Sequence, residues 1–412
     1  TTTNVRSYLL DRYSAPMTSL HSNADRVGVI GVGYVGLPLS LAMADAGYEV
    51  IGVDVNQERV QRINEGCSHI TDVTDQQIRE HLGERLSITT DYTKLEDVEG
   101  ISICVPTPLR NTGQPDISYI VDATERLTSV ISPGTTVVLE STVYPSATED
   151  VVAGILEDHG FSVGDDVFVA FSPERIDPGN DTYEPSDIPK VIGGVTTDCT
   201  DHAAALYQPV FDDIVRVESA IEAEMTKLLE NTFRSVNIAL INELATIAHE
   251  LDVDIWSVID AAATKPFGFL PFYPGPGLGG HCIPVDPFYL SWKASQQGID
   301  TRFIDLADTV NREMPGHVVN RIVESLNDDG VALSNASILI AGVAYKPDVS
   351  DTRESPAIDI INELEEWNAD ISYHDPFVPT LEVTGDTYES VPMTTERLEE
   401  ADCVAIITDH TS

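Results

Sequence analysis

One segment near the N-terminus constrains the fold of this chain more than any other. A short apolar run at 26–30 leads directly into Gly-Val-Gly-Tyr-Val-Gly at 31–36, and a helix-like apolar segment follows at 37–46. A second strand is predicted over 48–54, and it ends on Asp54, eighteen residues after the last glycine. This is the order of a βαβ unit with a dinucleotide fingerprint. It predicts an α/β fold that opens with a Rossmann-like, doubly wound domain.

The glycines of this loop indicate a dinucleotide cofactor. They let a pyrophosphate approach the start of the helix, where unpaired N–H groups and the helix dipole favour anions. The predicted contacts are Gly31, Gly33, Tyr34, Val35 and Gly36. Asp54 should accept hydrogen bonds from ribose hydroxyls and would repel a 2′-phosphate, which favours NAD over NADP. The alternative is a nucleotide fold that has lost its cofactor.

A second glycine-rich segment carries a single thiol. Cys282 lies in Gly-Leu-Gly-Gly-His-Cys-Ile-Pro-Val-Asp-Pro at 277–287. Glycines allow backbone angles that other residues avoid, and they let a ligand press against bare backbone. A thiol beside such a cavity can act as a nucleophile if its pKa is lowered. A buried cysteine in a tight loop is the alternative, but a nicotinamide cofactor together with a cysteine favours oxidation through a thioester.

Further α/β elements are expected on both sides of a helical middle. Strands are predicted at 101–105, 136–140 and 167–170, and the polar segments after them, 106–108, 141–142 and 172–175, are candidate site loops. A long helix is predicted over 218–251, with Lys227, Asn231 and Arg234 on one face, for which a solvated face is the alternative. A second helix is expected at 309–327. The long helix is well placed to form a dimer interface.

The last hundred residues predict a second α/β unit. Strands are expected at 338–345, 371–375 and 403–408, with a helix near 356–367. The sequence stops soon after the last of these strands, whereas a doubly wound domain normally continues with another helix. Either residues are missing or this end of the domain is abbreviated.

The charge balance excludes some classes of partner. The chain has 68 acidic and 23 basic residues, a formal charge of −45. Nucleic-acid binding through a basic surface is therefore not expected. Acidic residues spread along the whole chain repel one another unless salt screens them, which predicts a salt-adapted cytoplasmic protein.

The cysteine count and the hydropathy pattern give two more expectations. Five cysteines without CxxC or zinc spacing argue against disulfides and metal sites. No apolar run is long enough to span a bilayer, so no membrane segment is expected. Residues 1–25 are expected to form a loose leader.

Taken together, these blocks resemble the UDP-sugar 6-dehydrogenase family, which includes UDP-glucose, UDP-N-acetylglucosamine and UDP-N-acetylmannosamine dehydrogenases. The motifs that carry the resemblance lie at 31–36, 106–108, 140–143, 172–175, 227–234, 277–287, 345–347 and 351–356. The resemblance implies an NAD-binding domain at 26–217, a central helical dimerisation region at 218–327 and a UDP-binding domain at 328–412. It also implies a homodimer that oxidises the C6 alcohol of a UDP-sugar to a carboxylate with two NAD.

The resemblance also implies roles for individual residues. The catalytic set would be Cys282, Lys227, Asn231, Asp286, Glu174 and Thr142. Further contacts to NAD would come from Arg59, Thr107, Thr142 and Arg353. The UDP-sugar would meet Glu174, Arg175, Lys227, Asn231, Arg234, Tyr273, Gly279 and Lys346. No metal is implied.

Departures from the family pattern bear on the substrate. Val285 stands where many UDP-glucose enzymes have lysine, and Pro178-Gly179 stands where they often have a second glutamate. These features resemble the branch that acts on N-acetylated UDP-hexosamines, with UDP-glucose as the alternative. A protein with a dead site that only binds NAD or a UDP-sugar is a remote alternative. His281 is expected to pack within its loop, and Lys265 is the nearest candidate for a basic residue that reaches the partner subunit.

Overall fold

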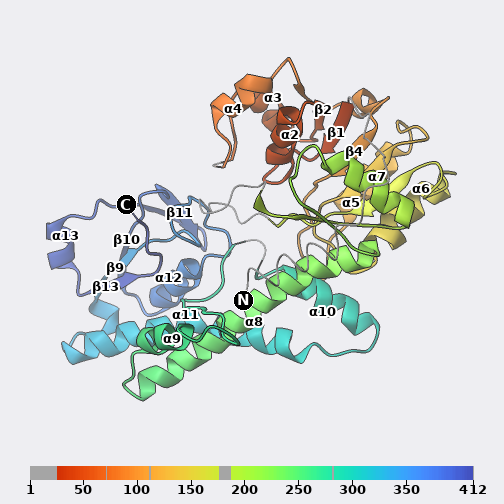
Figure 1. The fold of residues 1–412 in the computed structure, drawn as a ribbon. Coiled ribbons are helices and arrows are strands. Elements are labelled where there is room, and N and C mark those ends of the chain that lie inside the picture. The colour runs from red at the N-terminus through yellow and green to blue at the C-terminus, as the bar shows by residue number, and fades with distance from the viewer. Residues whose placement is uncertain (1–25, 71, 111–112, 176–186, 281–282, 412) are drawn as a thin grey trace. The chain divides into compact units, whose positions relative to one another are not determined.

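A computed structural model describes residues 26–70, 72–110, 113–175, 187–280 and 283–411 of the chain. The chain divides into two compact units, and the border in the sequence falls between Leu229 and Glu230 (Figure 1). The predicted leader, 1–25, lies outside the described residues, as do Pro178, Gly179, His281 and Cys282. The three-domain borders expected at 217 and 327 stay a prediction.

The first unit is built on a sheet that is parallel except at one pair. Within the described residues its strand order is β3-β2-β1-β4-β5-β6-β7-β8. The strands are β1 (Arg26–Ile30), β2 (Glu49–Val53), β3 (Leu86–Thr89), β4 (Gly100–Ile103), β5 (Thr136–Leu139), β6 (Phe168–Phe171), β7 (Lys190–Gly194) and β8 (Ile214–Arg216). Neighbours are parallel except β6 and β7. The first six strands follow the dinucleotide-binding order, in which the chain reverses direction across the sheet between β1 and β4.

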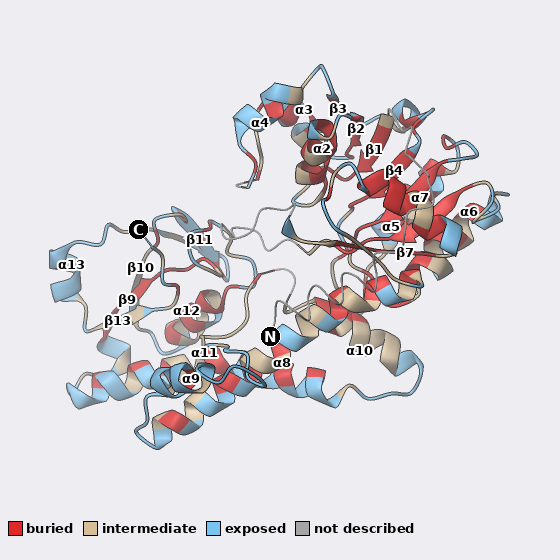
Figure 2. Ribbon diagram, in the orientation of Figure 1, coloured by how far each residue is buried: buried red, intermediate tan, exposed pale blue. Residues whose placement is uncertain are grey.

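Helices cover this sheet, and its strands are buried. The helical elements are α2 (Gly36–Asp45), α3 (Gln57–Asn64), α4 (Asp75–His81), η1 (Tyr92–Leu95), α5 (Ser118–Leu127), η2 (Thr148–Ala153), α6 (Gly154–Asp158) and α7 (Thr197–Tyr207). Strands with both faces covered need apolar residues at successive positions, which explains why they read as continuous apolar runs. Figure 2 shows β1, β2 and β4 as buried.

A helical region follows the sheet. Its elements are α8 (Ala220–Glu250), α9 (Ile255–Ala263), α10 (Asp286–Gln296), α11 (Arg302–Asp328) and the short η4 (Leu333–Asn335). The long helix expected at 218–251 is confirmed. The start expected for α11 at 309 is wrong by seven residues. Its first turns carry exposed apolar side chains, Phe303 and Leu306, beside buried Ile304, and this mixture hides the helical period.

The C-terminal part of the second unit holds a three-stranded parallel sheet among its described residues, in the order β10-β9-β13. The elements are β9 (Ser337–Ala341), α12 (Pro356–Glu366), β10 (Asp370–His374), β11 (Thr380–Val383), β12 (Asp386–Glu389), α13 (Thr395–Glu400) and β13 (Cys403–Ile406). The first strand was expected to run to 345, but it ends at Ala341 because Gly342 adopts a φ of +80°. Among the helices that the structure describes, none has the length and apolar character to cross a bilayer.

Candidate active site

The loop after β1 has the backbone that a dinucleotide cradle needs. Gly31 has a φ of +87°, and a Cβ on it would lie 2.6 Å from the Cys104 carbonyl oxygen. A Cβ on Gly36 would lie 1.8 Å from the Gly31 carbonyl oxygen, so glycine is required at both positions. A Cβ on Gly33 would meet only Arg59 Nη1, at 4.0 Å, which leaves that side of the loop open. These features fit the close approach of a pyrophosphate.

Asp54 follows β2 and is buried beside the same loop. Its Oδ2 accepts a hydrogen bond from the Val32 backbone N–H at 3.0 Å and one from Arg59 Nη1 at 2.8 Å. Its Oδ1 accepts from the Asn56 N–H at 2.9 Å. Asp54 therefore fixes the loop and orients Arg59 at the position where the adenosine ribose binds in this fold. Tyr34 is half exposed on the loop, and Val35 caps α2.

Thr107 and Thr142 follow neighbouring parallel strands, β4 and β5. Thr107 is buried and Thr142 is partly buried. Between them, Ser141 Oγ donates to the Val105 carbonyl oxygen at 2.8 Å, which joins the two loops. The structure thus brings both threonines to the carboxyl edge of the sheet, where ligands of open α/β sheets bind.

Glu174 lies three residues after β6, and its carboxylate is held at both oxygens. Oε1 accepts from the Arg175 N–H at 2.7 Å, and Oε2 lies 3.7 Å from Lys190 Nζ. Arg175 in turn donates through Nη1 to the Pro189 carbonyl oxygen at 2.8 Å. A small recess opens here, lined by residues 173–175 and 188–190 and by Phe211.

Two charged residues at this edge were not predicted from the sequence. Lys190 Nζ donates to Glu140 Oε2 at 2.6 Å, and both side chains are almost fully buried. Burial alone would lower the pKa of Lys190, but the carboxylates of Glu140 and Glu174 outweigh it and raise that pKa. Tyr207 also donates to Glu140. The sequence feature that could have indicated this ion pair is Lys190 itself, a charged residue at the start of the otherwise apolar strand β7.

Lys227 lies on the third turn of α8 and is buried, so the solvated-face alternative is wrong for this residue. Glu224, one turn earlier, accepts from the Ser146 N–H at 2.5 Å, the Thr148 N–H at 2.8 Å and Thr148 Oγ1 at 2.7 Å. Burial raises the pKa of Glu224 to about 7. Glu224 thus ties this part of α8 to the segment that follows Thr142.

Asn231 is one helical turn beyond Lys227, and its Nδ2 donates to Asp286 Oδ2 at 2.6 Å. Asp286 is the first residue of α10 and is 2% exposed. A carboxylate in the first turn of a helix is stabilised by the helix dipole. The predicted nucleophile, Cys282, lies outside the described residues, four positions before Asp286 in the sequence.

The glycines before Cys282 pack against the segment after β9. A Cβ on Gly279 would lie 2.6 Å from Tyr345 Cβ and 3.0 Å from the Glu354 carbonyl oxygen. Gly280 has a φ of +81°, and its N–H donates to the Arg353 carbonyl oxygen at 3.0 Å. The close approach predicted for these glycines is therefore made by the chain's own backbone and by Tyr345.

Other predicted residues also have neighbours in the structure. Arg353 is paired with Asp351, to which Nε donates at 3.0 Å. Lys346 Nζ lies 5.6 Å from the centre of the Tyr345 ring. Tyr273 is exposed and donates to Asp260 at 2.9 Å, and Arg234 is exposed. The described residues hold no cluster of metal-ligating side chains.

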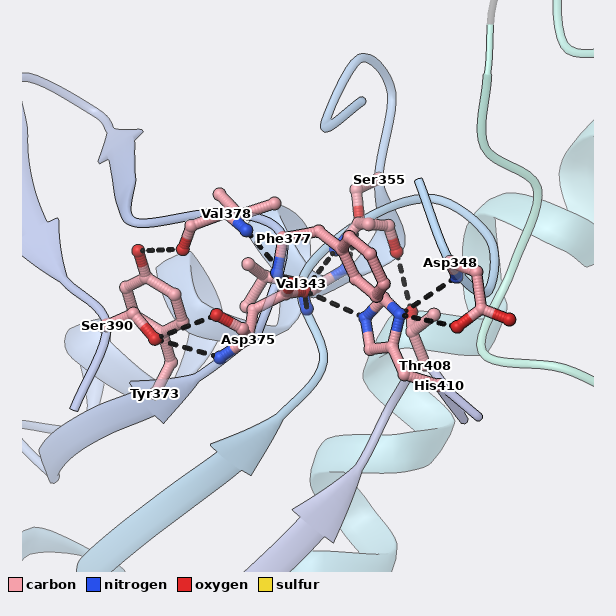
Figure 3. Close-up of polar contacts among 12 residues, drawn as sticks. Val343, Asp348, Ser355, Tyr373, Asp375, Phe377, Val378, Ser390, Thr408 and His410 are labelled. Atoms are coloured by element: carbon pink, nitrogen blue, oxygen red, sulfur yellow. Dashed lines mark hydrogen bonds and ion pairs between the residues drawn. The ribbon is translucent and has the colours of Figure 1, made fainter. Parts of the chain in front are cut away.

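Asp375 organises the carboxyl edge of the small sheet (Figure 3). It accepts hydrogen bonds from the backbone N–H groups of Val343, Ala344, Phe377 and Val378 and from His410 Nε2. His410 Nδ1 accepts from the Asp348 N–H at 2.9 Å, so the ring proton is on Nε2. Burial alone would raise the pKa of Asp375, but these hydrogen bonds outweigh it and lower that pKa. The loop that carries Lys346 is thereby fixed.

The large sheet and the three-stranded sheet share one local arrangement of hydrogen bonds. The Gly31 N–H donates to the carbonyl oxygen of Val53, the last residue of β2, at 2.7 Å. The Gly342 N–H likewise donates to the carbonyl oxygen of His374, the last residue of β10, at 2.8 Å. In each case the next N–H donates to an aspartate after the second strand, Asp54 at 3.0 Å and Asp375 at 2.7 Å. The expectation of two Rossmann-like domains is confirmed at this level of detail.

Comparisons with known proteins agree with this geometry. Residues 25–211 match the UDP-glucose/GDP-mannose dehydrogenase family, NAD binding domain; 221–313 match its central domain, and 339–412 its UDP binding domain. The UDP-N-acetyl-D-mannosamine dehydrogenase of Pyrococcus horikoshii is 36% identical over 390 residues, 93% of this chain and 89% of the relative. The UDP-N-acetyl-D-glucosamine 6-dehydrogenase of Pseudomonas aeruginosa is 36% identical over 355 residues, 86% and 83% of the two chains.

A solved structure gives the same result. The structure of the UDP-D-ManNAc dehydrogenase from Pyrococcus horikoshii has a TM-score of 0.86 and 34% identity, and the match covers 94% of this chain and 90% of that one. The expected oxidoreductase class and the NAD cofactor are confirmed by the matching NAD binding domain and by these relatives. The chain belongs to the UDP-glucose/GDP-mannose dehydrogenase family.

Proposed function

We propose that this protein oxidises the C6 alcohol of a UDP-N-acetylhexosamine to the carboxylate through a covalent intermediate on Cys282. The observation that supports the proposal is the 2.6 Å hydrogen bond between the Asn231 amide and the buried Asp286 carboxylate, which lies four positions after Cys282 in the sequence. When bound, NAD would accept one hydride in each of the two oxidations, so two NAD molecules are used in turn for each sugar.

Cys282 supplies the nucleophile. After the first oxidation, its thiolate adds to the C6 aldehyde and forms a C–S bond, which gives a thiohemiacetal. The second oxidation converts this adduct to a thioester. Water then forms a C–O bond as the C–S bond breaks, so the carboxylate leaves and the thiolate returns. Covalent capture keeps the aldehyde in the site between the two oxidations.

Lys227 and Asn231 stabilise the oxygen on C6. They are four residues apart on α8, and each presents N–H donors. A donor placed where negative charge develops contributes about 3 kcal/mol to transition-state stabilisation. Asp286 takes up the proton that leaves the C6 hydroxyl, directly or through water.

Glu174 and Thr142 act on the hydrolytic water. Glu174 is the general base, because its carboxylate is already oriented by the Arg175 N–H and lies near Lys190 at the edge of the sheet. Thr142 lies at the end of neighbouring β5 and positions the water.

The remaining predicted residues bind the ligands. NAD would be held by the glycine loop at 31–36, Asp54, Arg59, Thr107, Thr142 and Arg353. The UDP-sugar would contact Glu174, Arg175, Lys227, Asn231, Arg234, Tyr273, Gly279 and Lys346. The names of the two curated relatives and Val285 before Asp286 favour an N-acetylated sugar, and UDP-glucose remains the second substrate to test.

A substrate panel tests this function. With UDP-N-acetylglucosamine, UDP-N-acetylmannosamine and UDP-glucose in molar KCl, we expect two NADH per sugar consumed and a uronate product, with one of the N-acetylated sugars preferred. One NADH per sugar with accumulating aldehyde would overturn the thioester route. A preference for UDP-glucose would overturn only the choice of sugar.

The protein is further proposed to act as a homodimer in a salt-rich cytoplasm. Exposed apolar residues stand on α8 at Leu240, Leu244 and Ile247 and just after it at Leu251, at spacings of four, three and four, which is the spacing of a helix–helix interface. Exposed Trp256 on α9 is also apolar. A contiguous apolar stripe on a chain of charge −45 needs a partner that covers it.

A further inference from the structure

We infer that Lys190, held by Glu140, is a positioning residue for the hydrolytic half of the reaction. The inference rests on the proposed function, because it assigns Lys190 to the orientation of Glu174. Lys190 Nζ lies 2.6 Å from Glu140 Oε2 and 3.7 Å from Glu174 Oε2, so one ammonium lies between two carboxylates.

The sheet topology explains how a lysine comes to this edge. β7 is antiparallel to β6, with Phe171 opposite Gly193 and Ala170 opposite Gly194. Its first residue, Lys190, therefore lies beyond the carboxyl end of β6, on the same side as the loop that carries Glu174. Ser172 Oγ donates to the Val191 carbonyl oxygen at 2.9 Å and fixes this neighbourhood.

Glu140 keeps the ammonium in place. It follows β5 directly, its side chain is fully buried, and its other oxygen accepts a hydrogen bond from Tyr207. The Lys190 ammonium also lies 5.3 Å from the Tyr207 ring centre and 5.1 Å from that of Phe211. The Lys190 ammonium has little freedom to move, because the cost of removing its charge from water is offset only while it stays paired with Glu140. The fixed ammonium therefore holds the Glu174 carboxylate in one position by electrostatic attraction.

The consequence is specific to one step. Glu174 is proposed to act on water after the second oxidation, so loss of Lys190 should slow thioester hydrolysis and leave the two oxidations fast. Misplacement of a catalytic group by about 1 Å can cost about 100-fold in rate.

The test uses a double variant, because Lys190→Met alone would leave Glu140 buried without its partner and could prevent folding. Glu140→Gln/Lys190→Met removes both charges together. Stopped-flow measurement of NADH with saturating UDP-sugar should give a rapid burst of two NADH per site, followed by a steady-state rate reduced at least about 10-fold. Mass spectrometry of the quenched protein should detect the acyl adduct, while kcat/KM for the sugar, which reports the steps before hydrolysis, changes less than about threefold.

Two further variants make the result decisive. Asp201→Asn/Arg216→Met removes another ion pair of the same unit, in which Arg216 Nη1 lies 2.5 Å from Asp201 Oδ1, and should retain wild-type kinetics. Glu174→Gln alone should reproduce the burst and the slow phase, and adding it to the Glu140/Lys190 double variant should cause no further loss. Equal loss of burst and steady-state rates in the double variant, or normal hydrolysis in Glu174→Gln, would overturn the role of Lys190. Two NADH per uronate in the wild type would still support the proposed function in either case.

Discussion

Asn231 Nδ2 donates to Asp286 Oδ2 at 2.6 Å, and this hydrogen bond joins α8 to the first turn of α10. The two residues are 55 positions apart in the sequence. The bond holds a buried carboxylate against an amide at the start of the helix that follows the Cys282 loop. The chemistry proposed for C6 depends on this pairing.

Asn231→Asp should abolish most activity, because it places a second carboxylate against Asp286 and removes the amide donor. Loss of one oxyanion donor corresponds to about a 100- to 1,000-fold fall in kcat. NAD affinity should not change, since the glycine loop lies elsewhere in the sequence. Asn320→Asp, the same substitution at an exposed position on α11, is the control. Steady-state kinetics that match the control would remove Asn231 from the mechanism.

Cys282→Ser should stop turnover while NAD binding persists. A serine hydroxyl is far less nucleophilic than a thiolate near neutral pH, and an ester yields to water less readily than a thioester. Cys67→Ser, at a partly buried cysteine in the NAD-binding domain, should retain wild-type turnover. NADH formation and NAD titration measure both effects. Full turnover in Cys282→Ser would exclude the covalent route.

Glu224 should make stability depend on pH near neutrality. Burial raises its pKa to about 7 in the folded chain, from the ordinary value of 4.5. A carboxyl with a raised folded pKa contributes its full stabilisation below pH 4.5 and loses it as the pH rises through 7, an effect on the order of 3 kcal/mol. Tm should therefore fall between pH 5.5 and 8.5, and fall less in Glu224→Gln. Glu243→Gln, exposed on the same helix, should keep the wild-type slope, and an unchanged slope in Glu224→Gln would contradict the assignment.

The apolar stripe on α8 should set the oligomeric state. Ile247 is 47% exposed and Leu244 is 40% exposed in the isolated chain. A glutamate at either position would bury an unpaired charge in a dimer, so Ile247→Glu should shift the mass measured by light scattering from dimer to monomer. Leu398→Glu, at a comparably exposed leucine on α13, should leave the mass unchanged. A monomeric wild-type protein would refute the dimer.

Local patterns predicted much of the fold, and long-range contacts explain what they missed. The first βαβ unit was placed within a residue because glycines and an apolar run mark its turn and its strands. Recognisable motifs also singled out Asn231 and Asp286, which the structure joins by a hydrogen bond, while their catalytic roles stay a prediction. The Lys190–Glu140 pair was not, because the two residues are fifty positions apart and meet only through the reversed direction of β7.

High salt should stabilise the fold. The formal charge of −45 comes from 68 acidic residues against 23 basic ones, so most carboxylates have no cationic partner available. Screening shortens the reach of their repulsion from about 10 Å at 0.1 M salt to about 3 Å at 1 M. Tm of the ligand-free protein should therefore rise with KCl, and activity should be lost at low salt as the dimer and the fold weaken together. Sucrose, which stabilises folded proteins without screening charge, serves as the control at matched osmolality. If Tm is the same in 0.1 M and 2 M KCl, repulsion between carboxylates does not limit stability, and the proposed adaptation to salt fails while the chemistry assigned to Cys282 stands.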